Sequence, residues 1–197
     1  VAAAAAAVMQ LGPAAAQSYP ARPVRLVLPY PPGGGSDTIG RPLAQRLTES
    51  LGQQVVIDNR GGGSGNIGME HVAKSAPDGY TIVMALTAQV AVNPSLFRKL
   101  PYDPVKDFAP ITLLAQGPYV LVVHPSLPVR NLRELVALAR QRPNDLTYAS
   151  SGNGSGGHLA AELLNSMTGI RMVHVPYKGG GPALVDLISG QVQVLFG

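Results

Sequence analysis

Residues 24–38 read VRLVLPYPPGGGSDT, and they set the pattern for the whole chain. The apolar, β-branched run at 24–30 predicts a buried strand, and a glycine-rich loop follows at 31–37. Apolar residues then recur every four positions, as on one face of a helix: Ile39, Leu43, Leu47 and Leu51. A strand, a glycine-rich loop and a helix in this order predict a parallel sheet covered by helices.

The same alternation continues to residue 85. We expect a second strand at 55–58, a helix at about 67–75 and a third strand at 80–85, which together make a β-α-β-α-β core. Residues 92–108, VNPSLFRKLPYDPVKDF, hold three prolines and little periodicity, so this segment is predicted to be a loop.

A second block follows this loop. Two apolar strands are expected at 111–115 and 119–124, and a helix capped by Asn131 is expected over 131–141. Further strands are predicted at 146–150, 172–176 and 191–196, with helices near 158–167 and 182–188. The chain is therefore predicted to be α/β, with a first lobe at 19–123 and a second lobe at 124–197.

Composition excludes several classes of protein. The 197 residues include 15 Lys and Arg, 11 Asp and Glu, 4 His and no Cys, for a net charge of +4. The positive charges are scattered, so a nucleic-acid partner is not expected. Without cysteine there is neither a disulfide nor a zinc–thiolate site, and no metal or cofactor is expected.

The first sixteen residues, VAAAAAAVMQLGPAAA, are uncharged and end in three alanines. This pattern predicts the remnant of a signal peptide cleaved after Ala16, and thus an exported, periplasmic protein; the alternative is an alanine-rich structural helix. The chain starts without Met and stops directly after an apolar strand, so we expect both ends to be incomplete.

Four glycine-rich loops connect a predicted strand to a predicted helix, at 31–37, 61–68, 150–158 and 178–181. In an open parallel sheet such loops lie at the carboxyl ends of the strands, where ligands bind. Backbone N–H groups at glycines and at helix N-termini bind anions. The loops together predict a carboxylate or phosphate ligand.

In the first loop we expect the N–H groups of Gly34, Gly35 and Ser36 to be the donors. Asp37 either contacts the ligand or caps the following helix, and the cap is favoured because a carboxylate repels an anion. Tyr30 and Tyr177, each just before a loop, are candidates for apolar walls with a hydroxyl group.

The second half of the chain adds a further set of candidates. Ser150, Ser151, Asn153 and Gly154 are expected to orient a ligand carboxylate, or else to cap the next helix. His158 either pairs with Glu162 one turn later or points into the cleft as a donor. The ammonium group of Lys178 either contacts the ligand or is solvated at the surface.

Motifs typical of enzymes are missing or incomplete. Residues 63–68 and 152–157 match G-x-G-x-x-G, but neither is followed about 20 residues later by an acid that could bind a ribose. There is no phosphate-binding G-x-x-x-x-G-K-[ST] loop, no G-x-S-x-G elbow and no H-E-x-x-H pair. No catalytic residue is therefore predicted.

Five segments carry a resemblance to a known family: YPARPVRLVLPYPPGGGSDT, VVIDNRGGGSGNIGMEHVAKSAPDGYT, NPSLFRKLPYDPVKDFAPIT, LTYASSGNGSGGHLAAEL and VHVPYKGGGPALVDLISGQVQ. From residue 19 to 197 the chain resembles the Bug family, the periplasmic substrate-binding receptors of tripartite tricarboxylate transporters.

This resemblance implies a type II periplasmic-binding-protein fold, in which a Venus-flytrap cleft between two lobes holds a small carboxylate. The ligand would be a di- or tricarboxylate, an amino acid or an aromatic acid, delivered by a monomeric receptor to membrane permease subunits. The resemblance places the first loop and the loop at Thr87 on one side of the cleft, and the 150–154 loop and Lys178 on the other. A ligand-sensing domain of a signalling system and a nucleotide-dependent enzyme stay open as alternatives.

Overall fold

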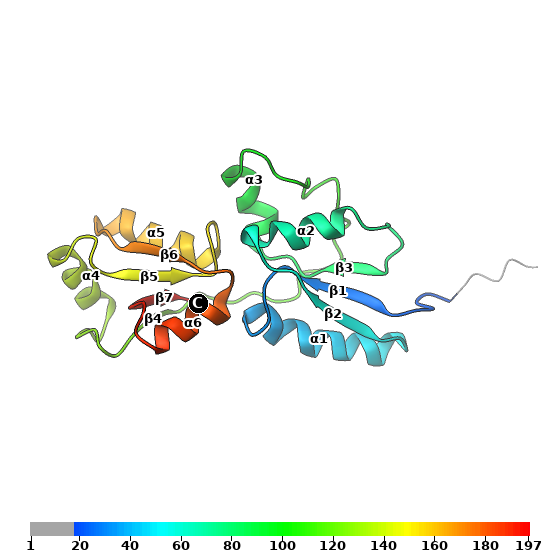
Figure 1. Cartoon of the computed structure of the whole chain (residues 1–197), viewed down its shortest axis with the longest axis horizontal. Coiled ribbons are helices and arrows are strands. Elements are labelled where there is room, and N and C mark those ends of the chain that lie inside the picture. Colours follow the sequence, from blue (N-terminus) through cyan, green and yellow to red (C-terminus); the bar gives the residue numbers. More distant parts are fainter. Residues whose placement is uncertain (1–17) are drawn as a thin grey trace, which may run out of the picture.

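The computed structural model describes residues 18–197, so the predicted signal segment and the cleavage after Ala16 lie outside the described residues. Two α/β bodies lie side by side, each built on its own sheet (Figure 1). We call the body with the sheet β2-β1-β3 the first lobe and the body with the sheet β4-β7-β5-β6 the second lobe.

The first lobe has three parallel strands with the first strand in the middle. The strands are β1 (Val24–Leu28), β2 (Val55–Asn59) and β3 (Thr81–Val83), and the helices between them are α1 (Gly35–Leu51) and α2 (Asn66–Ala73). Val24 pairs with Val55, and Arg25 pairs with Thr81. The predicted β-α-β-α-β core is confirmed. Gly52, in the left-handed conformation, is the C-cap of α1.

Alternation along β1 divides the first lobe's core between the two faces of the sheet. Val24, Leu26 and Leu28 pack with Ala44 of α1 in one buried cluster. Because side chains alternate in a strand, Val27 points to the opposite face, and it is fully buried there. The strong burial of β1 fixes the position of the loop that follows it.

The segment predicted as a loop at 92–108 begins with a helix at 93–96, whereas residues 97–108 contain neither helix nor strand, as predicted. A short π-helix, Ala88–Val92, runs into α3 (Asn93–Leu96), with Pro94 in its first turn. Gln89, Asn93 and Tyr102 are buried in this segment. Polar buried residues give no apolar periodicity, and this is why the sequence pattern missed these turns.

The second lobe contains four strands and three helices in residues 121–197. The strands are β4 (Leu121–Val123), β5 (Thr147–Ser150), β6 (Val173–Pro176) and β7 (Val194–Phe196), and the helices are α4 (Leu132–Gln141), α5 (Gly156–Thr168) and α6 (Gly180–Ile188). β5 pairs in parallel with β6 and β7, whereas β4 pairs antiparallel with β7. Asn131 caps α4 as predicted, since its side chain accepts a hydrogen bond from the Glu134 N–H.

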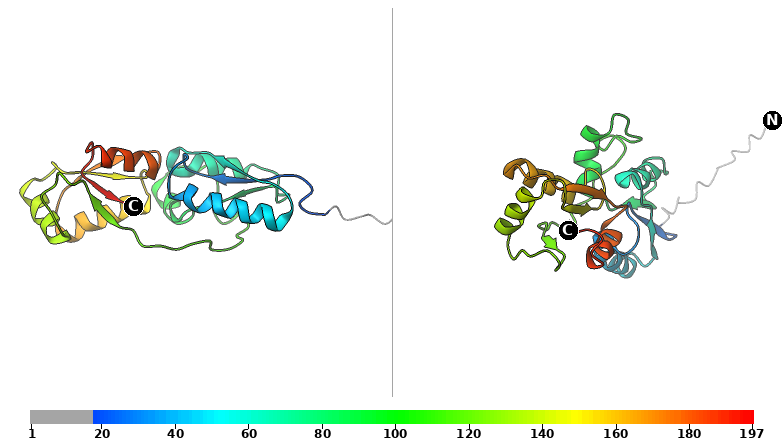
Figure 2. Two further views of the ribbon diagram at one scale, coloured as in Figure 1. Left: turned by 90° about the horizontal axis from the view of Figure 1, so that it is seen from below. Right: turned by 60° about the vertical axis from the view of Figure 1, so that its left-hand side comes forward.

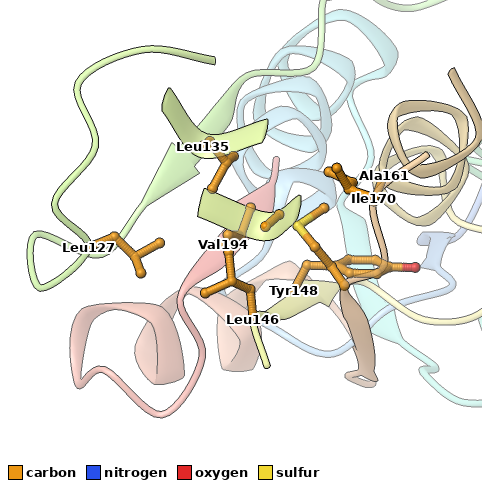
Figure 3. Close-up of a cluster of buried hydrophobic side chains, with 9 residues drawn as sticks. Leu127, Leu135, Leu146, Tyr148, Ala161, Ile170 and Val194 are labelled. Atoms are coloured by element: carbon orange, nitrogen blue, oxygen red, sulfur yellow. The ribbon is translucent and has the colours of Figure 1, made fainter. Parts of the chain in front are cut away.

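Helices cover both faces of the second sheet. Tyr148 and Val194 pack with Leu135 of α4 and Ala161 of α5 in one cluster, drawn in Figure 3. Their strand neighbours Ala149 and Leu195 turn to the other face and pack against α6. The two-sided core explains why adjacent residues are buried on both faces, Tyr148 and Ala149 in β5 and Val194 and Leu195 in β7.

The strand predicted at 111–115 is absent. These residues run as an extended, exposed segment between the lobes, visible along the lower edge of the left view of Figure 2, with Ile111 79% and Leu113 78% exposed. Within residues 18–197 no neighbouring strand pairs with this segment, so its apolar pattern alone does not make a strand.

The strand β4 belongs to the second sheet, although the predicted boundary at 123/124 assigned it to the first lobe. We therefore propose a boundary upstream of Leu121. Among residues 18–197, none of the helices combines the length and the apolar character that a bilayer crossing requires.

Candidate ligand-binding site

The loops at the carboxyl ends of both sheets face one another and form a seam between the lobes. On the first lobe the seam consists of the loops near 30–36, 61–66 and 86–96, and on the second lobe of those at 150–157 and 177–181. A Cβ on Gly34 would lie 3.6 Å from the amide nitrogen of Gly181, and a Cβ on Gly152 would lie 3.6 Å from Ser64 Oγ. The predicted loops are thus brought together by the fold.

The helix α1 begins one turn earlier than the predicted cap. Gly34 is the N-cap residue and provides no side chain, while Asp37 lies in the first helical turn. Asp37 is therefore not the capping residue that the sequence favoured. Its carboxylate instead accepts hydrogen bonds from the Gly33 N–H at 2.7 Å, Asn59 Nδ2 at 3.0 Å and Arg41 at 3.1 Å.

These bonds keep Asp37 ionised in a buried position. Burial by itself raises the pKa of Asp37, but the hydrogen bonds from Asn59, Gly33 and Arg41 outweigh it and hold the pKa below its ordinary value. The carboxylate is fully used within the first lobe, so it shapes the loop and leaves the ligand to other groups.

The donors expected in the first loop are available. In the described part of the chain, the N–H groups of Gly34, Gly35 and Ser36 donate to no backbone or side-chain acceptor. Ser36 is buried, and Gly35 is exposed. A helix N-terminus with free N–H groups and a partial positive charge is suited to an anion.

The helix α6 begins directly opposite α1. Its first residues are Gly180 and Gly181, and a Cβ on Gly34 would lie 3.7 and 3.6 Å from their amide nitrogens. The left view of Figure 2 shows the two helices nearly end to end across the seam. Lys178, just before α6, is exposed and forms no ion pair within residues 18–197.

In the loop after β5, some polar side chains form hydrogen bonds within the second lobe, and others are left without a partner at the seam. Ser150 is fully buried, and its Oγ bonds to the Gly152 carbonyl at 3.1 Å and to His174 Nε2 at 2.7 Å. Ser155, rather than any of the predicted residues, caps α5, because its Oγ accepts from the His158 N–H at 3.3 Å.

Ser151 is the hydroxyl of this loop that stays available. It has no hydrogen-bond partner among the described residues, and a Cβ on Gly180 would lie 3.8 Å from its Oγ. Asn153 is exposed, whereas Gly154 is buried, with a positive φ of 77°. Ser151 therefore lies beside the N-terminus of α6.

The structure supports neither of the two roles considered for His158. Its Nδ1 accepts from the Gly154 N–H at 3.1 Å, and its ring stacks on His174 with centroids 4.2 Å apart. Glu162, the predicted partner, instead accepts from the Tyr148 hydroxyl at 2.5 Å. His158 thus holds the 150–155 loop in place through its hydrogen bond with Gly154.

The two tyrosines and Thr87 also have defined places. Tyr30 is buried, and its hydroxyl accepts from Gln89 Nε2 at 3.0 Å; burial raises its pKa. The Tyr177 hydroxyl donates to Asp186 at 2.6 Å, and burial, followed by this bond to Asp186, raises the pKa of Tyr177 to about 12. Thr87 is exposed at the start of the π-helix.

A buried amide network behind Tyr30 was missed by the sequence reasoning. Gln89 Nε2 also donates to the Ser64 carbonyl at 2.7 Å, and Asn93 Nδ2 donates to the same carbonyl at 3.2 Å. The network holds the loops at 64–66 and 86–93 together. Buried amides carry no sequence motif, although the NPS turn after a strand was a possible signal.

A separate groove of about 440 Å³ lies on the outer side of the second lobe. It is lined mainly by apolar side chains of β4, α4 and α5, among them Leu121, Leu135 and Leu164. None of the predicted site residues lines it, so it is distinct from the seam.

Two α/β lobes whose loops meet at a glycine-lined seam define a protein of the periplasmic-binding-protein class. Residues 39–196 match the family model of the tripartite tricarboxylate transporter family receptor. The chain belongs to this receptor family.

Three relatives illustrate the match. The protein BugT of Bordetella pertussis is 43% identical over 181 residues, which are 91% of this chain and 56% of BugT. The structure of R. palustris Rpa4515 with adipate is 45% identical with a TM-score of 0.89, and MatC from Rhodopseudomonas palustris with bound malate is 34% identical with a TM-score of 0.84. Each structural match covers 90% of this chain and 60% of the other chain, so the chain spans little more than half of its relatives.

Proposed function

We propose that this chain is the ligand-binding part of a periplasmic receptor that captures a small carboxylate between its lobes and delivers it to a tripartite tricarboxylate-type membrane transporter. Export by a cleaved signal peptide and contact with permease subunits are parts of the same proposal. The receptor acts as a monomer and binds without catalysis or cofactor.

The meeting of the α1 and α6 N-termini carries this proposal. Each N-terminus has a partial positive charge of about half an elementary charge, and two such ends side by side repel each other. An anion between them removes the repulsion and accepts from the free N–H groups near Gly34 and Gly181. A carboxylate meets this need with two acceptor oxygens.

Two further observations agree with a carboxylate. The Ser151 hydroxyl and the exposed Lys178 lie next to the start of α6 and add a neutral donor and a positive charge. Among the relatives, one structure holds adipate and another holds malate. The candidate ligands are di- and tricarboxylates, amino acids and aromatic acids.

Ser150 and His174 lie 2.7 Å apart, a spacing also found in enzymes with a serine nucleophile. Ser150 is fully buried, however, and in residues 18–197 no carboxylate bonds to His174 to orient it. These features favour a structural pair. A ligand-sensing role would use the same seam, and it would differ by a receiver other than a permease.

Calorimetric titration of the chain tests the proposal. We expect one-site binding of at least one small carboxylate, with matched neutral amides of the same length failing to bind. Thermal stabilisation should grow with free ligand as RT ln(1 + [L]/Kd). Stabilisation by nucleotides with no response to any carboxylate would overturn the proposal.

A further inference from the structure

Asn93 has a buried acceptor atom without a partner. Asn93 Oδ1 and Asn165 Oδ1 are the buried side-chain atoms of residues 18–197 that form no hydrogen bond. Asn93 is fully buried, and its Nδ2 donates to Asn66 Oδ1 at 2.6 Å and to the Ser64 carbonyl at 3.2 Å. Since a carbonyl can only accept, Nδ2 must face Ser64, which fixes Oδ1 on the other side.

This free oxygen faces the second lobe. A Cβ on Gly154 would lie 3.4 Å from Asn93 Oδ1 and 2.6 Å from Leu96 Cδ2. The N–H of Gly154 donates to His158 Nδ1, so it does not serve Asn93. The other neighbours of that position, Val92 and Leu96, are apolar. Among residues 18–197 no group donates to Asn93 Oδ1, so this oxygen can take a donor from a bound molecule.

Contact between the lobes makes this oxygen costly. When the lobes separate, water can reach Oδ1, whereas contact with Gly154 buries it without a hydrogen bond, which is unfavourable. A ligand that brings an N–H or O–H group to this point removes the penalty. A bare carboxylate cannot do so, because it is an acceptor only.

The position of Asn93 fits a ligand that already lies in the seam. Asn93 and Gln89 share the Ser64 carbonyl, and Gln89 also bonds the Tyr30 hydroxyl. Tyr30 in turn lies beside Gly179, since a Cβ there would be 3.7 Å from its ring. One polar wall thus runs from Asn93 to the helix N-termini.

We propose that Asn93 Oδ1 accepts a hydrogen bond from a hydroxyl or ammonium group of the ligand, so that the receptor prefers hydroxy and amino carboxylates to unsubstituted acids. This inference rests on the proposed function and narrows its ligand class. The carboxylate binds at the meeting helices, and the donor group of the same molecule reaches Asn93.

The variant Asn93→Ala removes the acceptor with little other damage. The Ser64 carbonyl keeps its bond from Gln89, and Asn66 Oδ1 keeps its bond from the Tyr102 hydroxyl at 3.1 Å. Asn66→Ala is the matched control, because it deletes an amide of the same network and leaves Asn93 Oδ1 in place. The Tyr102 hydroxyl has one proton and lies within reach of two acceptors, so after that change it can donate to the Gln89 carbonyl at 2.9 Å.

The test compares acids that differ only in the donor group: succinate with malate and aspartate, glutarate with 2-hydroxyglutarate, and adipate with 2-aminoadipate. Calorimetry on the parent chain should show tighter binding of the substituted acid, by about tenfold in at least one pair. In Asn93→Ala the ratio should fall to about one, whereas Asn66→Ala should keep it. A ratio within one protein is insensitive to a general loss of folded molecules.

Three results would contradict the inference. Equal affinity within every pair for the parent chain would show that the protein does not recognise the hydroxyl or ammonium group of the ligand. A preference that persists in Asn93→Ala would show that a residue other than Asn93 recognises this group. If carboxylates bind in either of these cases, the proposed function stands and the inference alone fails. If no member of any pair binds, the proposed function fails and the inference fails with it.

Discussion

Gly34 and Gly181 lie against each other across the two lobes, close enough that a Cβ on Gly34 would be 3.6 Å from the Gly181 amide nitrogen. Each belongs to the start of a helix, α1 in the first lobe and α6 in the second. Because these residues have no side chains, two helix N-termini with partial positive charges can approach each other. An anion between them would be electrostatically favourable. In the proposed function, the glycines thus set both the spacing of the lobes and the negative charge of the ligand.

Gly181→Ala should weaken ligand binding. The new Cβ would lie 3.1 Å from the Gly33 carbonyl oxygen, which belongs to the backbone of the opposite lobe and cannot rotate away. We expect the lobes to separate slightly and the carboxylate affinity to fall about tenfold, equivalent to about 1.4 kcal/mol. Calorimetry measures this loss.

Gly180→Ala is the control for that variant. It lies in the same helix turn, but its Cβ would make an ordinary contact at 3.8 Å with Ser151 Oγ. Its affinity should stay within about twofold of the parent chain. Equal losses in both variants would show that the helix start, and not the approach of the lobes, limits binding.

Ser151→Ala and Ser155→Ala should have opposite effects. Ser151 has no partner among the described residues and lies beside the α6 N-terminus, so its loss should reduce affinity about tenfold to a hundredfold and leave stability unchanged. Ser155 caps α5, so its loss should cost about 1 kcal/mol of stability with little change in affinity. Titration and thermal unfolding of both variants decide this; reduced stability with full affinity in Ser151→Ala would remove Ser151 from the site.

Asp37→Asn should destabilise the first lobe. The buried carboxylate accepts three hydrogen bonds, and an amide cannot accept all of them, so we expect a loss of about 1–3 kcal/mol at pH 7. Because hydrogen bonds lower the folded-state pKa against the opposing effect of burial, this stabilisation is present above the ordinary Asp pKa and is lost as pH falls through the lower folded value.

Denaturant unfolding at pH 7 and at stepwise lower pH measures both parts of this prediction. The variant should lose less stability than the parent chain below about pH 4. Glu49→Gln is the control, since Glu49 forms an exposed ion pair with Arg46 that contributes about 0–1 kcal/mol. A parallel acid profile for Asp37→Asn and the parent chain would contradict the assigned role.

The fold could be predicted from the sequence wherever apolar residues repeat with a clear period. The four-residue spacing of Leu43 and Leu47 marked α1, and the apolar, β-branched run at 24–30 marked β1. The same signal misled at 111–115, because strand formation also needs a neighbour, which a local pattern does not report. The predicted lobe boundary placed β4 in the wrong sheet for the same reason, since the pairing of β4 with β7 spans about seventy residues.

The candidate site was predicted as a set of loops, and less well as single residues. Glycine-rich loops after strands pointed correctly to the edge where Gly34 and Gly181 meet. Which side chain caps a helix depends on where the helix starts. The N-cap of α1, Gly34, lies three residues before the expected cap Asp37, and α5 is capped by Ser155, which no expectation had named. The Gln89 and Asn93 network arises from contacts across 25 or more residues, so no local spacing reveals it.

His174 should make the second lobe sensitive to mild acid. Burial lowers the pKa of His174 to about 4, assisted by the neighbouring His158 and opposed by Glu162. An unfolded histidine titrates near pH 6.5, so between about 6.5 and 4 the unfolded chain binds more protons than the folded one. The free energy of unfolding should therefore decrease as pH falls through this window.

His174→Gln should remove this part of the pH dependence. At pH 7 the variant should be less stable than the parent chain, because the ring stacked on Tyr148 at 4.8 Å is lost, but its stability should vary less between pH 6.5 and 4. His124→Gln serves as the control, since His124 is bonded to Ser126 at the end of β4, outside this stack. Denaturant unfolding at half-unit pH steps gives the slopes; Asp37 contributes only at the acid end, so the two windows separate. If the slope is unchanged in His174→Gln and flattened in His124→Gln, the acid sensitivity belongs to His124, and the prediction for His174 is wrong.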